Sequence, residues 1–246
     1  MSINFGNITY RNDMGEIVTK EEFEQERQKF EKDVNEAYES KANEIISRIN
    51  SSTQNDIQKL WLLYDYLTGD NMQYNLQRTT SDGRMAIDVQ YEFPPYRNWK
   101  VSHSTKYPAL LNNSGICKTY SLAFEDIANK LGIPCRVVTG YTGMEHAWNI
   151  VLINGEVKHV DVAYATMRRN FSDKRDFFLK NFDELIQHSG SRTITNSVNE
   201  LTNEMIDQYK QLHPQIRVIS RTDIETTPKI TVINRTDTDE IKGMKR

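Results

Sequence analysis

Apolar residues recur at helical spacing near the start of the chain. Across residues 20–49 they stand mostly three or four positions apart, and Glu and Lys crowd the positions between them. Thr19 and Glu22 form a capping-box pattern at the start of this stretch. We expect a long amphipathic helix that packs one face on a domain; the alternative is a helix face that binds a protein partner. Its apolar positions are Phe30, Val34, Ala37, Tyr38, Ile45, Ile46 and Ile49.

Other segments carry shorter patterns. Residues 57–67 place apolar side chains on one helical face, with Thr53 and Asp56 as a cap. Residues 198–209 predict a helix that stops before Pro214, and the runs 216–219 and 230–233 predict short strands. Residues 70–112 contain turn-forming pairs and isolated aromatics, so we expect loops and short irregular pieces there.

The clearest helix signal lies in residues 117–131, which repeat apolar positions at three- and four-residue steps up to Gly132. With Ser114 as the N-cap, Cys117 falls in the first turn. Unpaired backbone amides and the helix dipole favour a thiolate there. On the helix alone, a buried and inert cysteine is the favoured interpretation. Cys135 lies in an apolar strand with no helix end beside it, and we expect it to be structural.

A hairpin follows at residues 146–161. Asn154-Gly155 between two β-rich runs predicts a two-residue type I′ turn, which fixes the register of the strands. In that register His146 and Asp161 are diagonal neighbours on one face, a gap that an imidazole and a carboxylate can close. Trp148 lies beside them, and His159 shares the face nearer the turn, where we expect a structural role.

A His–Asp pair beside a cysteine is what sulfur nucleophiles use. The carboxylate fixes the orientation of the histidine, and the histidine takes the thiol proton and later delivers one to the leaving amine. The alternative is a cross-strand pair on a half-solvated sheet face with no chemistry. The conjunction of Cys117 at a helix start with His146 and Asp161 favours the catalytic interpretation.

These residues resemble the transglutaminase-like superfamily of cysteine acyltransferases and peptidases, over about residues 57–180. Bacterial members show a Gly-x-Cys helix, a Leu-Gly-Ile-Pro turn, His-Ala-Trp-Asn, and Val-Asp at the end of the next strand. The matching segments are Gly115–Cys117, Leu131–Pro134, Arg136–Gly140, His146–Asn149 and Val160–Asp161, with Tyr64–Tyr74 upstream and Phe177–Leu179 downstream. The sequence departs from the family after the aspartate, where Val162–Tyr164 replaces a Thr-Trp-Asp type of run.

The resemblance implies an α+β fold with a papain-like core, in which the nucleophile helix packs on an antiparallel sheet. It implies Cys117 as nucleophile, His146 as general base and acid, and Asp161 as the residue that orients it. The backbone amide of Cys117 would be one oxyanion donor, with Tyr74 as the second. Trp148 could wall the site, although a core position is the expected role. We expect a polar segment and helix over 1–52, the catalytic domain over 53–180, and a C-terminal helix and strands over 181–246.

Several function classes are disfavoured by composition. A net charge of −3 gives no basic field for nucleic acid. Two cysteines without histidines at ligand spacing argue against a metal site, and no cofactor or EF-hand pattern is seen. No run reaches signal-peptide or transmembrane length, so we expect a cytoplasmic protein; a chain trimmed of a leader would look the same.

The predicted reaction is acyl transfer from a peptide or glutamine carboxamide through a thioester. Transamidation, deamidation and hydrolysis share this machinery, and a peptidase or amidase is slightly favoured over a cross-linking enzyme. The alternative from another class is a non-catalytic binding module that keeps the fold.

Overall fold

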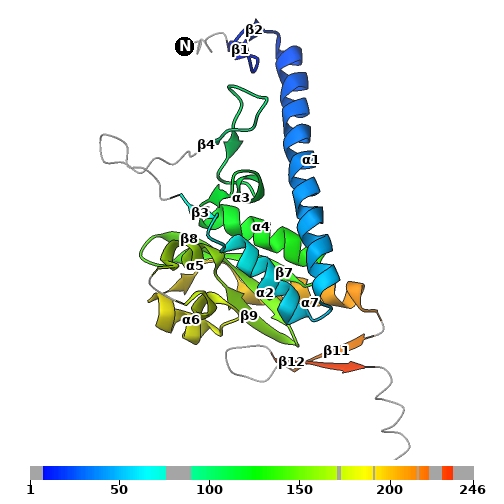
Figure 1. Cartoon of the computed structure of the whole chain (residues 1–246). Helices are drawn as coiled ribbons and strands as arrows, with labels where there is room; N and C mark the ends of the chain where they lie inside the picture. Colours follow the sequence, from blue (N-terminus) through cyan, green and yellow to red (C-terminus); the bar gives the residue numbers. More distant parts are fainter. Residues whose placement is uncertain are drawn as a thin grey trace, which may run out of the picture.

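The computed structural model describes residues 8–75, 90–170, 173–190, 192–214, 216–221 and 229–234. Helices and strands are mixed along the chain, as the α+β prediction requires (Figure 1). The helical elements are α1 (Lys20–Ser52), α2 (Asp56–Leu67), α3 (Tyr107–Leu111), α4 (Cys117–Lys130), α5 (Val162–Arg168), the 3₁₀ helix η1 (Lys174–Phe177), α6 (Phe182–Ser189) and α7 (Val198–Leu212).

The predicted long helix is confirmed as α1, with the capping box of Thr19 and Glu22 at its start. Its buried positions are Phe30, Val34, Tyr38, Ala42, Ile45 and Ile49, so one stripe packs inward and the remainder faces solvent. The expected cap of the second helix is wrong. Asn55 caps α2 by accepting the Gln58 amide, and Thr53 instead serves as the C-cap of α1.

The main sheet has the order β10-β7-β8-β9 among the described residues and is antiparallel throughout. Its strands are β10 (Thr193–Ile194), β7 (Cys135–Tyr141), β8 (Glu145–Ile153) and β9 (Glu156–Val160). The predicted turn is confirmed, since Asn154 and Gly155 both adopt positive φ, at 52° and 75°. The register is also as predicted, with Ile153 opposite Glu156 and Ile150 opposite His159.

Short strand pairs complete the structure. They are β1 (Tyr10–Arg11) with β2 (Ile17–Val18), β3 (Gln73–Tyr74) with β6 (Ser114–Gly115), β4 (Gln90–Tyr91) with β5 (Val101–Ser102), and β11 (Ile216–Arg221) with β12 (Lys229–Asn234). The last pair confirms the two strands predicted near the C-terminus. The region expected to be irregular holds β3, β4, β5 and α3, and residues 76–89 of it lie outside the described residues.

The core forms where α4 packs between helices and the main sheet. A cluster of buried apolar residues joins the C-terminal half of α1 to α2, α4, α5, β7, β8 and α7. A smaller cluster of Phe30, Val34, Tyr91 and Val101 joins the N-terminal half of α1 to the β4–β5 segment. Figure 1 shows α1 along one side of the domain, with its first turns near β1 and β2. Within the described residues, no helix is long and apolar enough to cross a bilayer.

Candidate active site

Cys117 lies in the first turn of α4, as the sequence predicted, but it is the first residue of the helix because the helix is capped differently. Ser114 is not the N-cap, because it lies in β6 and pairs in parallel with Gln73 of β3. The cap position is Ile116, whose amide donates to the Thr119 hydroxyl at 3.3 Å. The Cys117 thiol therefore sits at a helix N-terminus and is partly exposed, whereas Cys135 is fully buried.

His146 and Asp161 meet as the hairpin register predicts. Nε2 of His146 lies 2.8 Å from Oδ2 of Asp161, and both side chains are buried. Asp161 follows the last residue of β9 and caps α5, where its Oδ1 accepts the Tyr164 amide at 2.9 Å. The alternative of a half-solvated sheet face does not hold, since β8 is buried from His146 to Ile153. The carboxylate is thus anchored to the backbone and aimed at the imidazole.

The electrostatics of the pair extend to Cys117. Burial opposes charge on the thiol, but its hydrogen bond and charge interaction with His146 and the Ala147 amide lower the pKa of Cys117 below its usual value. For His146 burial opposes charge too, and the Asp161 carboxylate and Cys117 sulfur outweigh it, raising the pKa of His146 to about 9. Burial likewise opposes ionisation of Asp161, yet His146, Arg192 and the Tyr164 amide lower its pKa to about 2. This arrangement favours a thiolate beside an imidazolium at neutral pH.

Tyr74 enters the site from β3. The parallel pairing of β3 with β6 sets Tyr74 opposite Gly115, two residues before the cysteine. Burial is the main reason that the pKa of Tyr74 is raised, and the charges of Cys117 and Asp161 add to it. Hydrogen bonds join the Tyr74 side chain to both the backbone and the sulfur of Cys117. The phenol therefore stays protonated and lies against the thiol.

Trp148 forms one wall around the imidazole. Its ring stacks on His146, with centroids 5.8 Å apart and planes tilted by 20°, and it is fully buried. The indole N–H donates to Nδ1 of His159 at 3.0 Å. Burial, together with the Arg192 charge, lowers the pKa of His159 to about 4, so this ring is a neutral acceptor. The hydrogen bond to His159 therefore fixes the Trp148 ring where it packs against His146.

Arg192 was not foreseen from the sequence. Its side chain is fully buried just before β10, and Nη1 lies 2.8 Å from Oδ2 of Asp161. The guanidinium stands 5.0 Å from the Trp148 ring centroid and 4.8 Å from that of Tyr164. Arg192 follows Asp161 by about thirty positions in a polar stretch, so only the packing of β10 beside β7 shows the connection.

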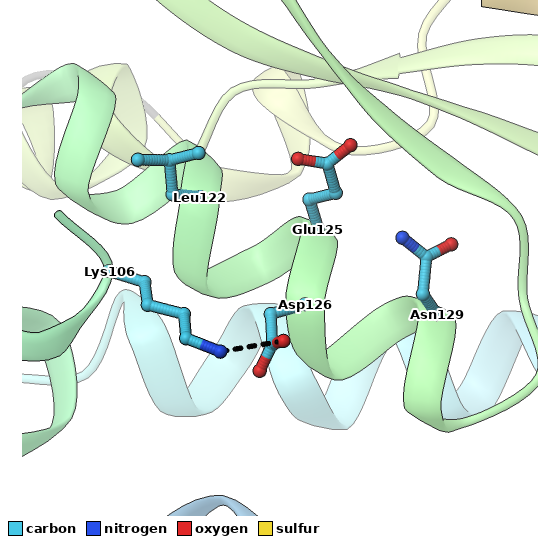
Figure 2. Close-up of a pocket in the computed structure, with 5 residues that line it drawn as sticks. All are labelled: Lys106, Leu122, Glu125, Asp126 and Asn129. Atoms are coloured by element: carbon cyan, nitrogen blue, oxygen red, sulfur yellow. Dashed lines mark hydrogen bonds and ion pairs between the residues drawn. The ribbon is translucent and has the colours of Figure 1, made fainter. Parts of the chain in front are cut away.

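A separate hollow of about 280 Å³ lies along the outer side of α4, lined by Lys106, Leu122, Glu125, Asp126 and Asn129. Figure 2 shows Lys106 reaching toward Asp126, and their charged atoms are 2.8 Å apart. Lys130 pairs with the same carboxylate. The lining carries no thiol, and its lysine is paired with Asp126.

Comparisons with known proteins concern the family and the fold. Residues 43–162 match the model of the transglutaminase-like superfamily. A solved structure described as "Crystal structure of a TGase" aligns over 59% of this chain and 34% of its own, at 17% identity and a TM-score of 0.39, so about a third of that solved chain is covered. No curated protein matches the sequence. Residues 43–162 are therefore similar to a transglutaminase-like core, and this match overlaps the segment of about residues 57–180 that carries the sequence resemblance.

Proposed function

We propose that this protein catalyses thiol-dependent acyl transfer or hydrolysis at a peptide or glutamine carboxamide, with Cys117 as nucleophile, His146 as general base and acid, and Asp161 as orienter. One observation carries the proposal. A helix-start thiol with a lowered pKa hydrogen-bonds to a buried histidine, which is itself held by a buried carboxylate. Such a constellation activates sulfur for attack on a carbonyl.

The reaction runs in two steps. The Cys117 thiolate forms a bond to the carbonyl carbon, and the negative charge moves to the carbonyl oxygen. As the tetrahedral intermediate collapses, the C–N bond breaks, and the departing amine takes a proton from His146, leaving a thioester. Water or a second amine then attacks the thioester while neutral His146 takes its proton, and the thiolate is released as the C–S bond breaks. Asp161 keeps the ring aligned through both transfers.

We propose two hydrogen-bond donors for the oxyanion. The Cys117 amide is free of an intrahelical partner because it belongs to the first turn of α4. The Tyr74 hydroxyl hydrogen-bonds to the same residue and remains protonated. Removing one oxyanion donor typically costs about 2.7–4 kcal/mol of transition-state stabilisation. Tyr74→Phe is therefore the variant that tests this role.

The acyl acceptor determines which reaction the thioester undergoes. Hydrolysis of a peptide or amide, deamidation of glutamine and transamidation use the same thioester and differ in whether water or an amine reaches it. We favour hydrolysis, with a protein or peptide as substrate. The competing proposal is a binding module that retains the fold without turnover. The reactivity of the Cys117 thiol distinguishes the binding module from the enzyme.

The test is alkylation of Cys117 by iodoacetamide between pH 5 and pH 10, with the modified residue identified by mass spectrometry. We expect labelling faster than that of a model thiol at neutral pH, and a slower rate in His146→Ala. Cys135→Ala is the matched control and should leave the rate unchanged, because Cys135 is fully buried. A wild-type rate equal to that of the model thiol, unaffected by His146→Ala, would end the enzymatic proposal. Incubation with peptide and glutamine-donor panels, against Cys117→Ala, then identifies the acyl donor.

A further inference from the structure

A permanent cation shares the Asp161 carboxylate with His146. Oδ2 receives both His146 Nε2 and Arg192 Nη1, each at 2.8 Å, while Oδ1 is taken by the Tyr164 amide. Nε of Arg192 is held by the Ser189 hydroxyl at 2.5 Å. Neither Nη1 nor Nη2 has a well-aligned hydrogen-bond acceptor among the described residues, so the charge of Arg192 is compensated by its ion pair with Asp161.

The Asp161–Arg192 ion pair matters for the charge balance of the site because it is buried. Asp161 and Arg192 are both fully buried, and a buried charge without a counter-charge is strongly unfavourable. The proposed reaction requires His146 to alternate between charged and neutral forms. Each time His146 gives up its proton, Asp161 would lose its only cation if Arg192 were absent. A guanidinium does not deprotonate in proteins, so it compensates the carboxylate at every stage.

Other groups near the pair cannot replace this cation. His159 of β9 is a neutral acceptor for Trp148, and Tyr64 of α2 and Tyr74 of β3 are phenols whose pKa values are raised, above all by burial. Cys117, at the start of α4, contributes negative charge when it ionises. Among the described groups that face Asp161, Arg192 is therefore the one that stays cationic throughout.

We propose that Arg192 is a positioning residue that holds Asp161 ionised and aimed at His146 while the histidine gains and loses its proton. This inference rests on the proposed function. It extends the working site beyond the segment that matches the transglutaminase-like superfamily, because Arg192 lies after residue 162. The segment before β10 would then have a functional role, because it places the Arg192 cation against the Asp161 carboxylate.

The test compares two substitutions at one position. Arg192→Gln removes the charge and keeps a polar side chain, and Arg192→Lys keeps the charge. The readout is the pH profile of Cys117 alkylation by iodoacetamide, which needs no substrate. Without the cation, Asp161 holds His146 less well, and the thiol titrates nearer its ordinary pKa of about 8.5. We expect Arg192→Gln to label about tenfold more slowly at pH 7, since each rise of one in pKa lowers the thiolate fraction about tenfold.

Arg192→Lys should stay within about threefold of the wild-type rate, as the positive charge is retained. The double variant Arg192→Gln with Asp161→Asn should label no more slowly than Asp161→Asn alone, because Arg192 acts through that carboxylate. Arg136→Gln is the control, since it removes a guanidinium from β7 that pairs with Glu204 away from the site. Circular dichroism confirms that each variant is folded.

The outcomes separate two failures. A fast wild-type thiol with an unchanged profile in folded Arg192→Gln would overturn the role of Arg192 and leave the proposed function standing. A double variant whose loss equals the product of the single losses would overturn it as well. If Arg192→Gln does not fold, the test rests on Arg192→Lys. An alkylation profile of Arg192→Lys displaced to higher pH than that of the wild type would then refute the role of the Arg192 charge. A slow wild-type thiol refutes the proposed function itself.

Discussion

Gly140 marks the tightest backbone approach beside the candidate site. It lies in β7 opposite Ile194 of β10, and a Cβ built at this position would stand 1.9 Å from the Thr193 carbonyl oxygen. The same carbon would stand 2.8 Å from Cη2 of Trp148. Its φ is outside the left-handed region, so the conformation itself accepts alanine. Gly140→Ala is therefore a perturbation by volume alone.

The cost follows from those distances. Backbone cannot remain at 1.9 Å from a carbon, so β10 must retreat by at least about 1 Å from β7. Overpacking of this kind costs about 1–3 kcal/mol. Alanine would otherwise stabilise a strand by about 0.5–1 kcal/mol relative to glycine. We expect a net loss of about 1–2 kcal/mol in the free energy of unfolding.

Urea denaturation monitored by tryptophan fluorescence measures this change, because Trp148 lies at the contact. Gly69→Ala is the matched control. A Cβ there would meet the exposed Asn71 side chain at 3.1 Å, which can move aside, and the Tyr66 carbonyl oxygen at 3.3 Å, which needs a shift of only a few tenths of an ångström. The change should therefore stay within about 0.5 kcal/mol. Because β10 directly follows Arg192, Gly140→Ala should also slow Cys117 alkylation. Equal stability of Gly140→Ala and wild type would show that β10 does not pack against β7 as described.

Further predictions concern the carboxylates of Asp161 and Asp13. Asp161→Asn should lose about 3–5 kcal/mol in urea denaturation, since Arg192 would stay buried without a counter-charge; a loss below 1 kcal/mol would contradict the ion pair. The folded pKa of Asp161 is about 2, below its ordinary value of 3.8, so its contribution to stability is present above about pH 4 and is lost as pH falls toward 2. Denaturation midpoints across pH 2–6 should show this loss in the wild type and less of it in Asp161→Asn. Asp13→Ala should cost about 1–3 kcal/mol in thermal unfolding, because the Asp13 carboxylate accepts the amides of residues 97–99; an unchanged midpoint would show these bonds to be dispensable.

The sequence predicted the local parts of the site because short-range rules determine them. The Asn154-Gly155 turn fixes the strand register, and the register brings His146 to Asp161. The stripe of α4 and Gly132, with φ of 83°, set the nucleophile helix. The predicted N-cap of that helix is wrong, because Ser114 pairs in parallel with Gln73 of β3. Local propensity does not encode this long-range pairing.

Long-range contacts account for what the sequence did not reveal. Arg192 and Asp161 meet only in the folded chain, and no spacing rule relates them. The helices α5 and α6 are short and were not anticipated; α5 starts where Asp161 caps it and packs on α4. The domain boundaries at 52 and 180, the partner face of residues 20–49 and the cytoplasmic location stay predictions.

The length of α1 has a consequence for how the protein opens. At 33 residues it extends about 50 Å, and its two halves are buried in different clusters. The cluster around Phe30 and Val34 is small, whereas the C-terminal half shares the main core. Amide hydrogens of residues 24–34 should therefore exchange with solvent through a local opening, well before those of residues 38–49, which require global unfolding. The helix is continuous in shape but composed of two cooperative units.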